Sequence, residues 1–256
     1  MIYTQLIKTN LSSQYFGKQI IYYPELESTN EMAWELLKID NADHGTLIIT
    51  DNQIKGKGRN NNSWFSSPNK GLTISLILKQ EIHSDKIGLI PLVAGICIIK
   101  LLEKFSVSPH LKWPNDILID EKKIAGVLCK SRWTKKRIHA IVVGFGMNVN
   151  ETKNDFPNKL RSCATSLRME TDDYHQLENL TAILINIFGK YWVKLNESSQ
   201  EIITDWISLC GHLNQKVSFN YLNTQYDGIF KGIDHKGQAI ITIKGNDKIF
   251  PSIILN

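Results

Sequence analysis

Apolar and polar positions divide the chain into short strand-like runs and a few longer helical stretches. Short runs rich in Ile, Leu, Val and Tyr are typical of strands. We expect strands over residues 20–23, 46–50, 72–78, 111–113, 117–119, 124–128 and 138–143. Several of them follow one another at hairpin spacing, which favours a mixed, largely antiparallel sheet.

Three stretches carry helical signals. Ser28 is predicted to be a helix N-cap, and Glu31 stands where it would complete a capping box. Residues 85–104 predict a long buried helix, and residues 176–195 place leucines and aromatic side chains at helical spacing. We therefore predict an α+β protein with its helices on one side of the sheet.

The texture of the chain changes after Asn214. Short strands are expected over residues 216–219, 226–230, 238–243 and 249–255, with turns at 236–237 and 244–247. A unit of about forty residues is marginal alone and should pack on the larger part. We predict a main domain over residues 1–210 and a small C-terminal β-barrel over residues 211–256.

The segment from Lys112 to Asp116, followed by Lys122 to Gly126, is the most informative part of the sequence. It reads Lys-Trp-Pro-Asn-Asp and then Lys-Lys-Ile-Ala-Gly around a predicted hairpin. A hairpin is a rigid support that can hold a cation and a carboxylate at a fixed distance. An ordinary hairpin with a solvated charged turn is the alternative explanation.

A second cluster follows the predicted strand over residues 46–50. It reads Gln53-Ile-Lys-Gly-Lys-Gly-Arg59, then three asparagines, Ser63 and Trp64. Glycines let the backbone approach a ligand, and backbone N–H groups beside Lys and Arg bind anions. The cluster matches neither a Walker loop nor the dinucleotide-binding glycine pattern. A flexible basic surface loop remains an alternative.

Together the two clusters resemble the biotin protein ligase family. The family pattern is matched, in order, by Ser28-Thr29-Asn30, by Gly56-Lys57-Gly58-Arg59, by Trp64 with Ser66-Ser67-Pro68, by Lys112 to Asp116, by Lys123 to Gly126, and by Gly144-Phe145-Gly146-Met147-Asn148. The resemblance runs from about Glu25 to the C-terminus. It implies a class II synthetase-like catalytic fold and an SH3-like C-terminal domain.

The resemblance also implies an activity. Ligases of this family join biotin to ATP, release pyrophosphate, and transfer the acyl group from biotinyl-5′-AMP to a lysine of a biotin carboxyl carrier protein, as in acetyl-CoA carboxylase or a related carboxylase. Arg59 and Lys123 correspond to the catalytic cations, and Asp116 is the candidate to orient the incoming amine and accept its proton. Mg²⁺ would be carried mainly by the ATP phosphates, and the chain's own metal ligands are unknown.

Ligand contacts are carried over position by position. The residues expected to bind biotin are Ser28, Thr29, Asn30, Gln53, Gly56, Lys57, Gly58, Arg59, Lys123 and Gly126. Those expected to bind ATP are Lys57, Arg59, Trp64, Asn115, Lys123 and Asn148. Three of these residues have a structural alternative: Ser28 as a helix cap, Trp64 as a packing residue and Asn148 as a turn residue.

The basic loop departs from the family pattern. Lys57 stands where the family has Arg, which keeps the charge but loses bidentate geometry. Asn60, Asn61 and Asn62 stand where further arginines often occur. We expect weaker affinity for the adenylate or its faster release.

Composition adds limits to this interpretation. The chain has 256 residues, 42% of them hydrophobic, and a net charge of +5, which is too small for a dedicated nucleic-acid binder. The four cysteines are scattered and neither a signal peptide nor a membrane span is found, so a cytoplasmic location is expected. The pattern begins near residue 25, and we expect a monofunctional ligase that binds no operator DNA.

Two other functions stay open. A lipoate or octanoate ligase or transferase shares the fold, but it would need a long apolar slot where this chain has Ser28, Thr29, Asn30 and Gln53. A non-catalytic biotin-binding regulator would not need Arg59, Lys123 and Asp116. The sequence does not identify a strand at which two copies would pair, and a homodimer is left open.

Overall fold

The computed structural model describes residues 1–79, 85–134, 137–222, 224–253 and 255. Its main part is built on a seven-stranded sheet, in which β1 and β2 run parallel and the other neighbours run antiparallel. The predicted mixed, largely antiparallel sheet is confirmed. The strand order is β1 (Ile20–Leu26), β2 (Leu47–Gln53), β3 (Leu72–Leu78), β7 (Arg137–Met147), β6 (Lys122–Thr134), β5 (Asp116–Ile119) and β4 (Pro109–Lys112).

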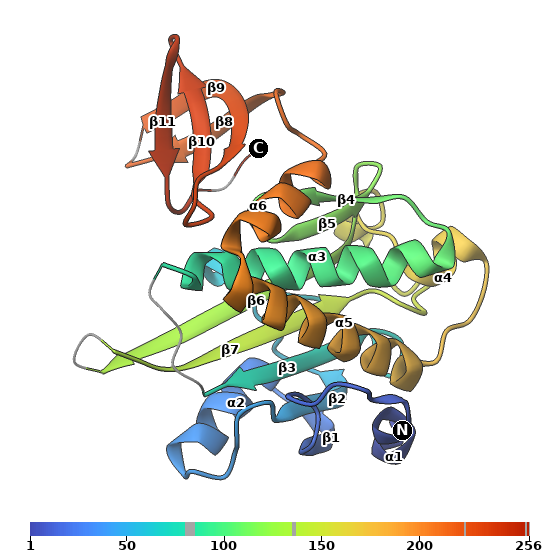
Figure 1. Cartoon of the computed structure of the whole chain (residues 1–256). Helices are drawn as coiled ribbons and strands as arrows, with labels where there is room; N and C mark the ends of the chain where they lie inside the picture. Colours follow the sequence, from blue (N-terminus) through green and yellow to red (C-terminus); the bar gives the residue numbers. More distant parts are fainter. Residues whose placement is uncertain (80–84, 135–136, 223, 254, 256) are drawn as a thin grey trace.

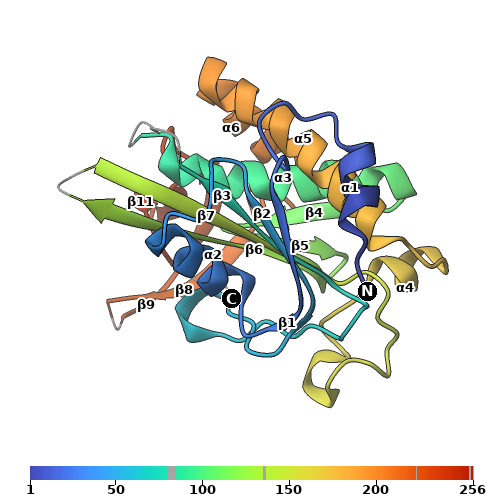
Figure 2. The same ribbon diagram turned by 90° about the horizontal axis from the view of Figure 1, so that it is seen from below.

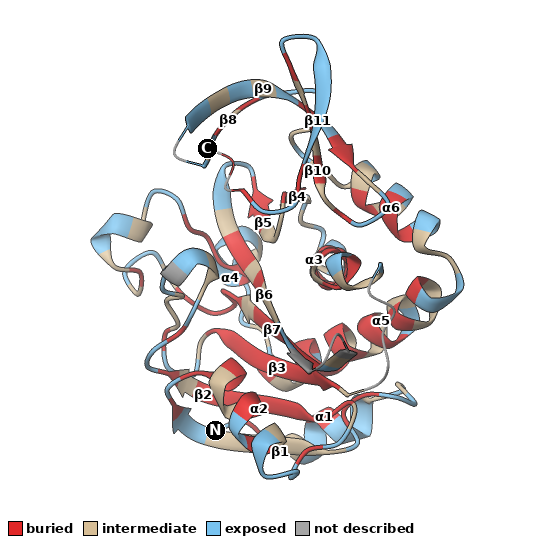
Figure 3. Ribbon diagram, turned by 90° about the vertical axis from the view of Figure 1, so that its left-hand side faces the viewer, coloured by how far each residue is buried: buried red, intermediate tan, exposed pale blue. Residues whose placement is uncertain are grey.

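Helices cover the sheet unequally. The larger core lies under α1 (Thr4–Asn10), α3 (Ile90–Leu102), α5 (Leu177–Glu197) and α6 (Ser199–Ser208), as Figures 1 and 2 show. In β3 the side chains of Leu72, Ile74, Leu76 and Leu78 belong to this core, and β2 and β3 are buried along most of their length (Figure 3).

One helix, α2 (Thr29–Lys38), covers the opposite face. Its Ala33, Trp34 and Leu36 form a separate core with Ile48 and Ile77 of the sheet. Because strand side chains alternate between faces, Ile48 and Ile77 lie on the side away from the larger core. The expectation that helices lie on one side therefore fits the other long helices but not α2.

Several predicted boundaries need correction. Helix α2 begins where Ser28 predicts, but the Ser28 side chain makes no capping hydrogen bond, and Glu31 pairs with lysines instead. The capping box is therefore not formed. The predicted helix over residues 85–104 is shorter because α3 begins at Ile90, with Pro91 in its first turn, between 3-10 turns at Ile87–Leu89 and Glu103–Phe105. The short helix α4 (Leu167–Thr171) was not predicted.

The C-terminal strands form a separate antiparallel sheet above the main part in Figure 1. Its order is β11 (Asn246–Phe250), β10 (Ala239–Ile243), β9 (Thr224–Ile233) and β8 (Lys216–Tyr221). The turn expected at 244–247 is shorter, because Lys244 and Gly245 alone have positive φ and β11 starts at Asn246. The division of the chain at residue 211 stays a prediction. Among the described helices, none is long and apolar enough to cross a membrane.

Candidate active site

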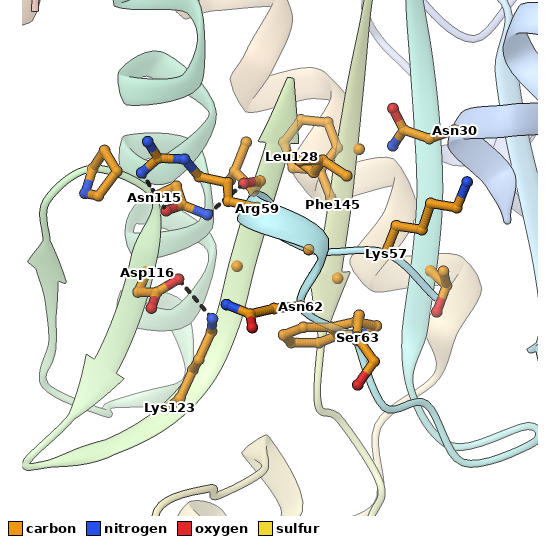
Figure 4. Close-up of a pocket in the computed structure, with 18 of the residues that line it drawn as sticks. Asn30, Lys57, Arg59, Asn62, Ser63, Asn115, Asp116, Lys123, Leu128 and Phe145 are labelled. Atoms are coloured by element: carbon orange, nitrogen blue, oxygen red, sulfur yellow. Dashed lines mark hydrogen bonds and ion pairs between the residues drawn. The ribbon is translucent and has the colours of Figure 1, made fainter. Parts of the chain in front are cut away.

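A cavity of about 300 Å³ opens on the sheet face that carries α2. It lies between the first turn of α2, the β5–β6 hairpin, β7 and the segment of residues 54–64, which we call the basic loop (Figure 4). Most of the residues predicted from the sequence line it: Ser28, Thr29, Asn30, Gln53, Lys57, Gly58, Arg59, Trp64, Asn115, Asp116, Lys123 and Gly126. The fold thus brings both sequence clusters to one place.

Two glycines of β7 lie beneath the cavity and leave space for side chains that line it. A Cβ atom on Gly144 would lie 1.9 Å from Nδ2 of Asn30, and one on Gly146 would lie 2.5 Å from Cε2 of Trp64. Contacts that short do not occur between real atoms. The glycines therefore make room for these two side chains to lie directly on the sheet.

One end of the cavity is polar and uncharged. The backbone N–H of Thr29 donates to Oε1 of Gln53 at 2.9 Å, and Ser75 Oγ donates to the Thr29 hydroxyl at 2.8 Å. Asn30 Nδ2 donates to Ser75 Oγ at 3.2 Å. Asn30 Oδ1 is buried and finds no hydrogen-bond partner among the described residues. A buried acceptor without a partner costs free energy, and a ligand N–H group could satisfy it.

The other end carries charge. Lys123 Nζ lies 2.6 Å from Oδ1 of Asp116, across the β5–β6 hairpin. The same ammonium lies 5.6 Å from the centre of the Trp64 ring, within the range of a cation–π contact. The hairpin therefore holds a cation and a carboxylate together, as the sequence predicts.

Arg59 belongs to this end as well. It donates through Nη1 to Oδ1 of Asn115 at 3.5 Å and through Nη2 to Oγ of Ser252 at 3.0 Å. Burial lowers the pKa of Arg59 and the Asp116 charge raises it, but a guanidinium stays protonated at any physiological pH. Asn115 is itself fixed, because its Nδ2 donates to the carbonyl of Val127 at 2.7 Å.

Two predicted residues do not line the cavity. Gly56 sits at the base of the basic loop, where its carbonyl accepts from the N–H of Trp64 at 2.9 Å. Asn148 is buried behind the site, and its amide donates to the carbonyls of Thr165 at 2.9 Å and Lys123 at 3.4 Å. Its predicted contact with adenine finds no support in this position.

The sequence interpretation also missed residues. Thr73 lines the cavity and Ser75 supports its polar end, and both interrupt an apolar strand at alternate positions. That alternation was a readable signal that this face of β3 meets something polar. Leu128 and Phe145, from neighbouring strands, supply an apolar middle. Leu255 and Ser252, from the C-terminal segment, had no local signal.

A neutral polar end, an apolar middle and a cationic end with a carboxylate define a class of site. It suits an enzyme that holds a small acid by a polar head and stabilises negative charge where its carboxylate reacts. The sequence profile of the biotin/lipoate A/B protein ligase family matches residues 22–148. The chain belongs to this family.

The relatives agree with that assignment. The bifunctional ligase/repressor BirA of Bacillus subtilis is 31% identical over 251 residues, which cover 97% of this chain and 77% of that protein. The biotin–[acetyl-CoA-carboxylase] ligase of Paracoccus denitrificans is 24% identical, over 88% of this chain and 95% of its own length. The solved structure of the Aquifex aeolicus biotin protein ligase in complex with biotin and ATP is similar, with a TM-score of 0.79, 28% identity and coverage of 93% and 99%.

Proposed function

We propose that this chain is an ATP-dependent biotin protein ligase. It forms biotinyl-5′-AMP and pyrophosphate from biotin and ATP, and then transfers the biotinyl group to a lysine of a carrier protein. The observation that carries the proposal is the cavity itself, where the unpaired amide oxygen of Asn30 and the Lys123–Asp116 pair occupy opposite ends. Similarity to the Aquifex aeolicus enzyme, whose structure contains biotin and ATP, supports it.

The polar end suits the ureido ring of biotin. A ureido group has two N–H donors and one carbonyl acceptor. Asn30 Oδ1 accepts one N–H, while the side chains of Ser28, Thr29 and Gln53 surround the rest of the ring. Lipoate or octanoate would require a long apolar slot at this end, and these polar side chains do not form one.

The cationic end suits adenylation. A carboxylate oxygen of biotin attacks the α-phosphorus of ATP, a new O–P bond forms, and the bond to pyrophosphate breaks. Both reactants are anions, so the cations at this end lower the repulsion. Arg59 and Lys123 stabilise the charge that builds on the α-phosphate oxygens during the attack.

Transfer to the carrier uses the carboxylate of the hairpin. The lysine amine attacks the acyl carbon of biotinyl-5′-AMP, an amide bond forms, and the acyl–phosphate bond breaks to release AMP. Asp116 orients the amine and accepts the proton that it loses. A non-catalytic regulator would have no use for this carboxylate beside Lys123.

ATP itself lies between the hairpin and the basic loop in this proposal, near Lys57, Trp64 and Asn115. Mg²⁺ is held mainly by phosphate oxygens and water.

The partner in this proposal is a biotin carboxyl carrier domain of acetyl-CoA carboxylase or a related carboxylase. The Paracoccus denitrificans relative is named as a ligase that acts on acetyl-CoA carboxylase, which supports this choice of partner. A cytoplasmic location stays a prediction from the sequence, and a homodimer stays open.

Transfer of labelled biotin to a purified carrier domain tests the proposal. Wild-type chain with biotin, ATP and Mg²⁺ should label the carrier, and Lys123→Ala should reduce the rate by at least about 100-fold. Lys122→Ala is the matched control, because Lys122 is the neighbouring, exposed lysine of the same hairpin. Biotin binding without transfer would favour a regulator, and no biotin binding at all would favour the lipoyl branch of the family.

A further inference from the structure

The basic loop reaches the rest of the protein through charged side chains. Lys55 Nζ lies 2.5 Å from Oε1 of Glu27, and Lys57 Nζ lies 3.2 Å from Oε1 of Glu31. Arg59 contacts the hairpin and the C-terminal segment, as described above. Because these ion pairs are largely exposed, each is weak and the loop can open without unfolding the domain.

Glu31 is a meeting point of three elements. Its Oε1 accepts from Lys130 of β6 at 2.7 Å and also pairs with Lys57 of the basic loop, while Glu31 itself stands in the first turn of α2. Hydrogen bonds from Lys130 and then Lys57 hold the pKa of Glu31 below its usual range against the opposing effect of burial, so the carboxylate is charged at neutral pH. One oxygen thus joins helix, sheet and loop.

The position of this carboxylate relates it to the cavity. Glu31 directly follows Ser28, Thr29 and Asn30, which line the polar end. Figure 4 shows Lys57 directed toward the helix that carries Asn30 and away from Lys123. The Lys57–Glu31 contact therefore ties the loop to the wall of the cavity that lies opposite the cationic end.

We propose that Glu31 is a positioning residue that clamps the basic loop over the ligand through Lys57, with Lys130 holding the carboxylate in place. It deepens the proposed function, because the ligand retained under the loop is biotinyl-5′-AMP until a carrier lysine arrives. Lys57 is a lysine where the family pattern has arginine, so a single ammonium makes the contact to Glu31.

The clamp makes a prediction with a definite sign. Removing the Glu31 charge breaks the contact to Lys57 and raises the open fraction of the loop by about 1.5- to fivefold. If Glu31 instead competed with the adenylate for Lys57, removing it would strengthen the attraction between the loop and the phosphate. The first case predicts faster loss of adenylate, and the second predicts slower loss.

Retention of labelled adenylate distinguishes the two cases. Enzyme loaded with labelled biotin and ATP is separated from free ligand, and the loss of biotinyl-5′-AMP is followed over time. Glu31→Gln should lose it about 1.5- to fivefold faster than wild type. Glu27→Gln is the matched control, because it removes the other carboxylate paired with this loop, and it should retain adenylate as wild type does.

Further variants test whether Glu31 acts through Lys57. In a Lys57→Gln background, Glu31→Gln should have no further effect on adenylate loss, and Glu31→Asp should restore part of the retention in the otherwise wild-type chain. Equal or slower loss in Glu31→Gln, or full additivity with Lys57→Gln, would overturn the clamp.

Limited trypsin digestion measures loop opening without catalysis, since Lys55 and Arg59 are cleavage sites within the loop. Cleavage at these sites should be about 1.5- to fivefold faster in Glu31→Gln than in wild type, and Glu27→Gln should affect cleavage at Lys55 alone. Unchanged cleavage at Arg59 would refute the clamp. If wild type forms no adenylate, the proposed function fails, and this digestion still decides on the clamp.

Discussion

The Asn30 oxygen that lacks a partner among the described residues gives a prediction in which ligand binding changes much more than stability. The side chain is 5% exposed, its Nδ2 bonds to Ser75, and its Oδ1 lacks a partner among the described residues. Leaving such an acceptor unsatisfied costs about 1–3 kcal/mol in the free protein. A ligand N–H that satisfies it recovers that free energy, so Asn30→Ala should weaken biotin binding by roughly 5- to 150-fold.

The same substitution should leave the free protein nearly as stable as wild type. It removes a partner from Ser75, but it also removes the unsatisfied oxygen, and these changes oppose each other.

Titration calorimetry with biotin and thermal unfolding without ligand would measure both effects. Asn52→Ala is a suitable control, because Asn52 bonds to Glu25 outside the cavity. Unchanged biotin affinity in Asn30→Ala would refute the reasoning. A loss in the free energy of unfolding as large as the loss in binding free energy would refute it as well.

Three other changes are predicted, at Asp116, at Gly146 and at Glu151, a buried carboxylate whose Oε2 accepts from the backbone N–H of Val149 at 2.7 Å. Asp116→Asn should slow transfer to the carrier by about 100-fold in single-turnover assays while pyrophosphate release falls much less, and equal losses in both steps would contradict its assigned role. Gly146→Ala places a methyl group against Trp64, so it should cost about 1–3 kcal/mol of stability and raise the KM for ATP, measured by thermal unfolding and steady-state kinetics. Burial raises the pKa of Glu151 to about 7, so the folded chain binds a proton that the unfolded chain has lost, and stability falls as the pH rises from 4.5 to 7. At pH 8 Glu151→Gln should therefore be more stable than wild type in thermal unfolding, by at most about 3 kcal/mol in the free energy of unfolding. The difference should shrink at pH 5.

The strands of the main sheet were predictable where apolar side chains dominate the run. Strand β3 has the predicted bounds, whereas β6 and β7 extend well beyond residues 124–128 and 138–143. Lys130 and Arg132 continue β6 because its backbone still pairs with β7, although their side chains lie on a partly exposed face. Hydrophobic patterning cannot detect such pairing, because partners across a sheet are set by the fold.

Helix α6 was missed although a local signal was present. It follows α5 after the extended residue Ser198, and its apolar side chains recur at helical spacing: Ile202, Ile203, Trp206 and Ile207. The sequence interpretation overlooked this short amphipathic pattern, whereas the placement of α6 against α3 and α5 depends on tertiary packing.

The site divides in the same way. Residues within the two sequence clusters come together as expected, because a loop and a hairpin next to one sheet face bring them close. Ser252 reaches the site from the end of the chain, and its contribution depends on tertiary contacts alone. Ser75 reaches it from a central strand, where its alternation with apolar residues was a local signal that the sequence interpretation overlooked. Asn148 matches the family motif, but its amide contacts the carbonyls of Thr165 and Lys123 in this structure, and its contact with adenine stays a prediction.

The indole of Trp113 donates to the carbonyl of Gly237 at 3.1 Å, and Arg59 reaches Ser252. The first contact joins the turn between β9 and β10 to the turn between β4 and β5, and the second joins the segment after β11 to the basic loop. Both link the C-terminal part to segments next to the reactive groups. The two parts of the protein are therefore not interchangeable modules: a chimera that takes residues 211–256 from one relative and the remainder from another would need matching residues around Trp113 and Arg59. Over evolution, substitutions in the C-terminal segment should be accompanied by substitutions around Trp113 and Arg59. These two contacts therefore limit how freely the sequence of the C-terminal sheet can change.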